Sequence, residues 1–218
     1  RGHASLAHVQ PLAKGDASRR HAQVCRAVHD AGALAAQLEN PAYGKMINRK
    51  HFDRVRGLID PARVVLGGTA DEKALKIEPT IMDKATPQDP VMGEEIFGPV
   101  LPVIAFDSLD EAIDLVRSRP TPLALYLFSQ DRATQRRVMR EVPFGGGCVN
   151  DTIMHLATSH MGFGGMGASG MGSYHGRKSF ETFTHEKSIL RKVTFVDVPL
   201  RYQPYSSWKS KLVRAFLH

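Results

Sequence analysis

Two cysteines, Cys25 and Cys148, are the residues of this 218-residue chain that could act as thiolate nucleophiles. They form no CxxC pair, which argues against a disulfide scaffold and a structural zinc site and fits a reducing, cytoplasmic compartment. Cys148 lies in an apolar strand and is interpreted as a core residue. For Cys25, a buried or inert thiol is the favoured interpretation, and catalysis is the alternative.

Three side chains that could ligate a metal, Asp151, His155 and His160, follow shortly after Cys148. A protein metal site needs three or four ligands at a defined spacing, and no further ligand motif accompanies this group. We therefore expect no metal.

Six glycines in residues 162–172 produce two overlapping GxGxxG matches. That pattern binds a dinucleotide phosphate when it joins a strand to a helix N-terminus. Here the preceding residues 154–161 are no clean strand, and the Ser-Tyr-His-Gly that follows shows no apolar helical periodicity. The glycines predict a loop whose backbone passes close to a substrate or a neighbouring helix.

The elements that must position these residues alternate between strand and helix. Apolar runs predict strands, the first of them buried, at 64–66, 101–106, 123–128 and 147–150. Apolar spacing predicts helices over 45–59 and 131–142, and the capping box Ser108-Leu-Asp-Glu111 starts another that ends before Pro120. This alternation predicts an α/β fold with a parallel sheet.

The net charge of +7 is concentrated at the chain ends. Residues 187–218 hold seven basic side chains against one acid, whereas residues 31–186 hold 17 basic and 19 acidic ones. A nucleic-acid-binding domain carries its basic stripe on the body of the fold, so nucleic acid is not an expected partner. No apolar run approaches the about 20 residues of a membrane-spanning helix, and no secretory signal is visible.

Several long segments occur in a fixed order: Glu94-Glu-Ile-Phe-Gly-Pro99, Pro122-Leu-Ala-Leu-Tyr-Leu-Phe128, Gly147-Cys-Val-Asn-Asp151, the run from Phe163 to Gly176, Ser179-Phe-Glu-Thr-Phe-Thr-His185 and Leu200-Arg-Tyr-Gln-Pro-Tyr205. Together they resemble the aldehyde dehydrogenase family, in its class-three branch of bacterial type, which includes fatty-aldehyde and coniferyl-aldehyde dehydrogenases. The resemblance runs from Tyr43 to His218, and long motifs in register are more specific than a single glycine pattern.

The resemblance implies oxidation of an aldehyde to a carboxylic acid with NAD or NADP. In this family a cysteine thiolate attacks the aldehyde, hydride passes to the nicotinamide, and water assisted by a glutamate hydrolyses the thioester. The cysteine, that glutamate and the Rossmann domain lie N-terminal to the Glu-Ile-Phe-Gly-Pro motif. The chain is therefore expected to be a C-terminal portion that lacks its nucleophile and general base and is inactive alone. Arg1 in place of methionine favours such a fragment.

By the same resemblance, Glu95 would accept hydrogen bonds from the nicotinamide ribose hydroxyls, and Phe97 would pack beside the nicotinamide ring. From the local sequence alone, Glu94 and Glu95 would be a solvated turn. Phe163 is expected to line the aldehyde tunnel, with Tyr174 and His175 as further pocket candidates. Asn150 is expected to fix backbone near the reaction centre. The family requires no metal.

Three parts of the chain are expected: residues 1–40, which match the family poorly, a partial catalytic domain over 41–186, and an oligomerisation segment over 187–218. In the last of these, 187–195 would form a dimerisation strand, because a homodimer is expected for the full-length protein. Residues from Ser206 predict a short basic amphipathic helix, for which docking on a substrate mouth or partner subunit is favoured over peripheral membrane contact. The alternative to an enzyme portion is a non-catalytic remnant that associates with full-length subunits.

Overall fold

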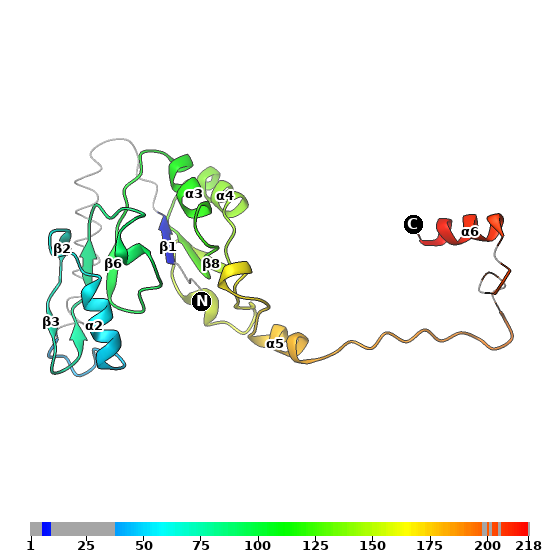
Figure 1. Ribbon diagram of the computed structural model, residues 1–218, viewed down its shortest axis with the longest axis horizontal. Coiled ribbons are helices and arrows are strands. Elements are labelled where there is room, and N and C mark those ends of the chain that lie inside the picture. The colour runs from blue at the N-terminus through cyan, green and yellow to red at the C-terminus, as the bar shows by residue number, and fades with distance from the viewer. Residues whose placement is uncertain (1–5, 10–37, 198–199, 201, 205, 218) are drawn as a thin grey trace. The chain divides into compact units, whose positions relative to one another are not determined.

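The computed structural model describes residues 6–9, 38–197, 200, 202–204 and 206–217. It divides the chain into two units, Arg1–Phe183 and Thr184–His218, and each is described by itself (Figure 1). Cys25 lies outside the described residues, so its predicted state stays a prediction.

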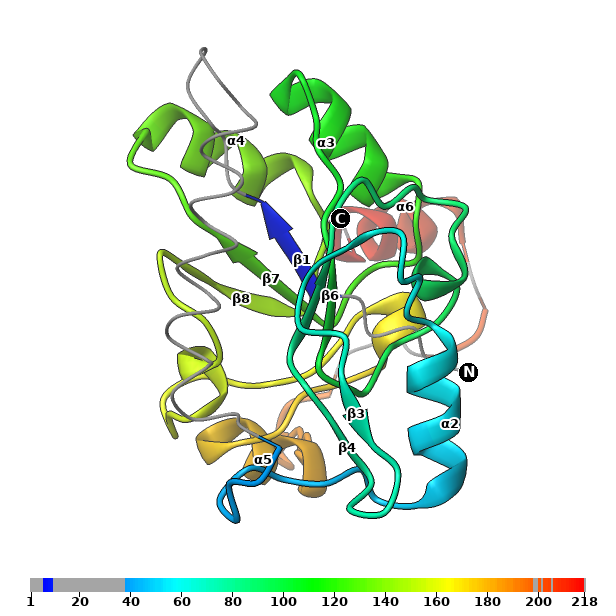
Figure 2. The same cartoon turned by 90° about the vertical axis from the view of Figure 1, so that its left-hand side faces the viewer.

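The main sheet of the first unit has three parallel strands in the order β1-β7-β8, which are β1 (Leu6–Val9), β7 (Ala124–Leu127) and β8 (Gly146–Val149). Helix α3 (Leu109–Arg117) precedes β7, and α4 (Arg132–Glu141) joins β7 to β8. Both helices cover one face of β7, where Leu125 and Leu127 meet Ile113 and Val138 in a buried cluster. Figures 1 and 2 show the two helices side by side along this sheet. The parallel β7-α4-β8 crossover confirms the predicted α/β arrangement for this part of the chain.

Helix α3 begins at the predicted capping box. Ser108 Oγ accepts the backbone amide of Glu111 at 3.2 Å, and Glu111 Oε2 accepts the amide of Asp107 at 2.9 Å. These bonds satisfy amides that the first helical turn leaves without backbone partners. The predicted start of this helix is therefore confirmed.

A second, mixed sheet has the order β2-β5-β6. Strand β2 (Val64–Leu66) runs antiparallel to β5 (Thr80–Met82), which runs parallel to β6 (Val100–Pro102). A hairpin of β3 (Ala70–Asp71) and β4 (Lys76–Ile77) lies beside helix α2 (Arg49–Gly57), as Figure 2 shows. The apolar face of α2 buries Phe52 and Val55 in a second core.

The prediction of one parallel sheet is wrong for the strand expected at 101–106. This strand, β6, pairs with β5 in the register Thr80 to Val100, and not with β7. An alternation of strands and helices does not specify which neighbour a strand pairs with, and the buried strand β5 was not predicted. In addition, β2 is not fully buried, because it lies at the edge of its sheet with Val65 51% exposed.

The glycine-rich run is a loop, as predicted, and its backbone segments approach closely. A Cβ atom on Gly164 would lie 2.2 Å from the carbonyl oxygen of Gly172, and one on Gly165 would lie 2.1 Å from that of Ser169. Glycine is required wherever such contacts leave no room for a side chain. Helix α5 (Gly176–Phe183) follows the loop and was not predicted.

In the second unit, the described residues contain the predicted terminal helix, α6 (Ser207–Leu217). Lys209 Nζ of this helix donates to the carbonyls of Tyr202 and Pro204 at 3.1 and 3.2 Å. Residues 187–195 form no strand in the single chain, and the side chains of Ile189 and Leu190 are exposed. Within the described part of the chain, no helix is both long and apolar enough to cross a membrane.

Candidate functional site

The turn that carries Glu95 and Phe97 lies between the 3-10 segment Pro90–Met92 and β6, and it belongs to no helix or strand. Its anchor is Arg54 of α2, which sequence reasoning did not single out. Arg54 Nη1 donates to Glu94 Oε1 at 2.8 Å and to the Glu95 carbonyl at 3.4 Å, and Nη2 donates to the Ile96 carbonyl at 2.6 Å. These bonds tie the turn to α2, and Glu94 forms an ion pair with Arg54.

Phe97 adopts a backbone conformation that is strained for an aromatic residue, with φ at 45°. Its side chain is 74% exposed, whereas Glu95 is half-buried. The next residue, Gly98, lies against Val55, since a Cβ there would be 2.6 Å from Val55 Cγ1. The arrangement presents a carboxylate and an exposed aromatic ring two residues apart, on backbone fixed from α2.

A second group of predicted residues, Phe163, Tyr174 and His175, lies together on the glycine-rich loop. Phe163 and Tyr174 exchange backbone hydrogen bonds of 2.8 and 2.9 Å as an antiparallel bridge. Their ring centroids are 5.7 Å apart in an edge-to-face arrangement, and the His175 ring lies 4.5 Å from that of Tyr174. Edge-to-face contacts of this kind are favourable between aromatic rings. The structure therefore brings these three side chains into one aromatic cluster.

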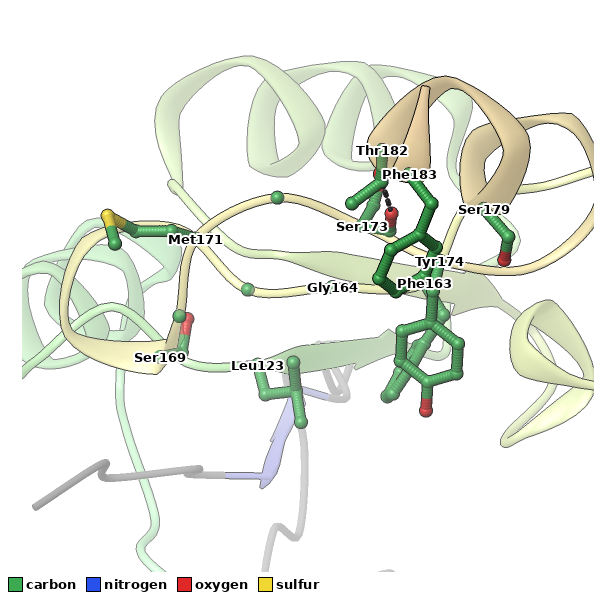
Figure 3. A pocket seen from close by; sticks show the side chains of 13 residues that line it. Leu123, Phe163, Gly164, Ser169, Met171, Ser173, Tyr174, Ser179, Thr182 and Phe183 are labelled. Atoms are coloured by element: carbon green, nitrogen blue, oxygen red, sulfur yellow. Dashed lines mark hydrogen bonds between the residues drawn. The ribbon is translucent and has the colours of Figure 1, made fainter. Parts of the chain in front are cut away.

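Phe163 and Tyr174 line a hollow of about 580 Å³ within the first unit (Figure 3). Most of the accessible lining is apolar and comes from the glycine-rich loop and α5. Its aliphatic hydroxyl groups belong to Ser169, Ser173, Ser179 and Thr182, and Thr182 Oγ1 donates to the Ser173 carbonyl at 2.9 Å. Sequence reasoning missed Leu123 and Phe183, which complete the wall, because neither lies in a glycine motif. His175 does not line this hollow and supports it through Tyr174.

Behind the aromatic cluster, His155 is buried against the sheet. Its ring lies 5.7 Å from both the Tyr126 and the Phe163 rings, and its Nδ1 is 3.5 Å from Cys148 Sγ. Burial lowers the pKa of His155, because the cationic imidazolium is desolvated. Among the described residues, no three His, Cys, Asp or Glu side chains lie close enough together to hold a metal ion. Asp151, His155 and His160 therefore form no such group.

Asn150 lies at the end of β8 in a left-handed conformation with φ at 58°. Its side-chain amide accepts from the Ser129 N–H at 2.8 Å and donates to the Ser129 carbonyl at 3.0 Å. Asn150 therefore ties together the segments that follow β7 and β8. Parallel sheets place binding sites at the carboxyl ends of their strands, which is where this clamp lies.

This chain is similar to known proteins over most of its length. The sequence profile of the aldehyde dehydrogenase family matches residues 21–189. The 4,4'-diaponeurosporen-aldehyde dehydrogenase of Staphylococcus aureus is 49% identical over 180 residues, which are 82% of this chain and 39% of that protein. The dimeric NADP-preferring aldehyde dehydrogenase of Rattus norvegicus is 50% identical over 69% of this chain and 33% of that protein.

The fold comparison agrees. The structure of Staphylococcus aureus AldH in a substrate-bound state covers the whole chain with a TM-score of 0.85 and 38% identity, and the chain covers 54% of it. Lactaldehyde dehydrogenase from Escherichia coli has a TM-score of 0.67 over 82% of the chain. The chain therefore belongs to the aldehyde dehydrogenase family, and within it to the class-three branch. It spans between a third and two fifths of the length of these curated relatives.

Proposed function

We propose that this chain is the C-terminal part of an enzyme that oxidises an aldehyde to a carboxylic acid with NAD or NADP, and that it does not turn over alone. The observation that carries this proposal is 49% identity to a dehydrogenase over only 39% of that relative. The nucleophilic cysteine, the general base and the Rossmann domain would come from sequence outside the matched segment. The activity is therefore a property of the assembled enzyme.

The turn at Glu95 and Phe97 would hold the nicotinamide end of the cofactor, which supplies the hydride acceptor. A half-buried carboxylate suits paired ribose hydroxyls, because an ionised carboxylate is purely an acceptor. An exposed ring on fixed backbone leaves an aromatic face open to a flat partner. These observations support the assignment of Glu95 and Phe97 to cofactor binding.

The aldehyde would enter beside Phe163 and Tyr174, with His175 as a supporting side chain. The apolar lining of this hollow favours an aldehyde with an apolar chain or ring, such as a fatty or a coniferyl-type aldehyde. Asn150 would hold the ends of β7 and β8 near the reaction centre through its bonds to Ser129.

A chimera tests the proposal. The matched segment of the staphylococcal relative is replaced by this chain, and reduced NAD or NADP is followed with medium-chain and aromatic aldehydes. We expect turnover by the chimera and none by the chain alone. Turnover by the chain alone would refute the proposal that the chain lacks its nucleophile, and Cys25 would then be the first residue to replace. A folded chimera without turnover would favour a non-catalytic remnant.

Exposed apolar side chains favour one further candidate role, association with a second subunit. Ile189, Leu190 and Phe195 are 78%, 88% and 86% exposed in the single chain, and residues 187–195 would pair as a dimerisation strand. The Rattus norvegicus relative is named as dimeric. Analytical ultracentrifugation of the chain and of Leu190→Asp tests this role. A monomer that Leu190→Asp leaves unchanged would contradict it.

A further inference from the structure

We infer that Arg54 is a positioning residue for the cofactor, acting through the backbone of the turn that presents Glu95 and Phe97. The inference rests on the proposed function, because it takes that turn as the nicotinamide-binding element. Arg54 lies on α2, a helix in the second core that was predicted only as a structural element.

The turn has a conformation that needs support. Phe97 has φ at 45°, in a region that L-residues with large side chains rarely occupy. Such strain persists when the surrounding contacts over-determine the backbone. Residues 94–98 belong to no helix or strand, so the regular ladders of the fold do not hold them. Contacts from a neighbouring element must therefore contribute.

Arg54 supplies those contacts in a way that only a guanidinium can. One nitrogen reaches the Glu94 carboxylate and the Glu95 carbonyl, and the other reaches the Ile96 carbonyl. The two carbonyls belong to consecutive residues immediately before Phe97, so the planar fork fixes the orientation of both peptide groups. A lysine ammonium is a single charged centre and cannot reach the Glu94 carboxylate and both main-chain carbonyls at the same time. The Arg54 side chain is also only 25% exposed, which limits screening by water.

The residue after Arg54 provides a second anchor to the same turn. Val55 is fully buried, and its methyl groups occupy the space that a side chain at position 98 would need. Two consecutive residues of α2 therefore hold the turn on both sides of Phe97, one through polar bonds and one through packing. Arg54 bonds to Glu95 through the main-chain carbonyl of Glu95.

The test uses Arg54→Gln and the conservative Arg54→Lys, with Arg56→Gln as a matched control. Arg56 lies on the same helix and pairs with Glu72, away from the turn. In the full chain, NMR relaxation gives backbone order parameters for residues 95–98. We expect them to fall from about 0.85 to below about 0.6 in Arg54→Gln, less far in Arg54→Lys, and not at all in Arg56→Gln.

The second readout is the dissociation constant for NAD, measured in the chimera by titration without aldehyde. Loss of hydrogen bonds to a charged group predicts a rise of about tenfold or more in Arg54→Gln. Unchanged order parameters in a folded Arg54→Gln chain would overturn the inference. A loosened turn with unchanged NAD affinity would overturn it too, provided that Glu95→Gln weakens binding. If Glu95→Gln also leaves affinity unchanged, the proposed cofactor site itself is wrong.

Discussion

The imidazole of His155 lies edge-on to the ring of Tyr126, with ring centroids 5.7 Å apart and ring planes at 68°. Tyr126 belongs to β7, and the face it presents is opposite to the one that Leu125 and Leu127 bury under α3 and α4. The segment after β8 is therefore packed onto the second face of the main sheet. The His155 ring lies close over Gly146, where an added Cβ would be 3.1 Å from His155 Cδ2.

The buried imidazole predicts a pH dependence of folding. Burial lowers the pKa of His155 in the folded chain, so below the ordinary value of 6.5 the unfolded chain binds the proton more readily. The free energy of unfolding is therefore not reduced by His155 above pH 6.5. It falls as the pH drops from 6.5 through the lowered pKa of the folded chain, because protonation then favours the unfolded chain. Urea unfolding at pH 7.5 and pH 5.5 measures it. His155→Phe should flatten the difference, whereas His160→Gln, at an exposed position, should retain it.

Removal of the Phe163 ring should weaken the aromatic cluster. Phe163→Ala loses ring contacts to both Tyr174 and His155, each worth about 0.5–1.5 kcal/mol beyond the area buried. We expect a loss of about 1–3 kcal/mol in the free energy of unfolding, measured by urea denaturation. Met171→Ala, at a position 97% exposed on the glycine-rich loop, is the control and should cost less than about 0.5 kcal/mol. Equal losses would contradict the packing role of Phe163.

Gly176 should not tolerate a side chain. Its φ is 52°, and an added Cβ would lie 1.8 Å from the carbonyl oxygen of Ser159. Gly176→Ala is expected to destabilise the chain by about 1–3 kcal/mol, because it combines backbone strain with overlap. Gly44→Ala meets no atom within 4 Å and serves as the matched control. Thermal unfolding of both variants decides the point, and an unaffected Gly176→Ala midpoint would show that the loop relaxes freely.

Helix α3 offers a local test of the capping box. Ser108→Ala removes the oxygen that accepts the Glu111 amide and should cost about 1 kcal/mol. Ser108→Asp keeps an acceptor at the helix N-terminus and should restore most of that loss. Chemical denaturation monitored by circular dichroism gives both values. If the alanine variant matched the original chain, solvent would be capping the helix equally well.

The sequence predicted best where the structural signal is local. The capping box at Ser108, the helix starting at Asp131 and the β7-α4-β8 crossover depend on residues that are close together in the chain. The glycine-rich loop was also predictable, because glycine spacing reports close backbone approach directly. The aromatic residues Phe163 and Tyr174 lie in the same segment, but their place in a pocket was predicted from the family resemblance.

Long-range partners were not predictable from local pattern. Nothing in the sequence around Val100 shows that β6 pairs with β5. In the sequence, Arg54 is one of several arginines on a helix, and only the structure shows its bonds to residues 94–96. The pocket walls at Leu123 and Phe183 were missed for the same reason, since they meet the loop only in space. A sequence pattern reports which face of an element is apolar, and not what covers it.

The position of β1 in the main sheet has a consequence for how the chain folds. The central strand β7 has one partner, β8, that a single helix connects to it, and another, β1, that comes from the start of the chain. The entropy of loop closure favours the near partner, so β7, α4 and β8 should assemble first and β1 should dock late. During synthesis β1 leaves the ribosome long before β7 has been made. Until β7 is made, the backbone N–H and C=O groups of β1 cannot form the hydrogen bonds that pair the two strands. The edge of the nascent sheet beside β7 is therefore the place where a chaperone or a second nascent chain would compete with correct folding.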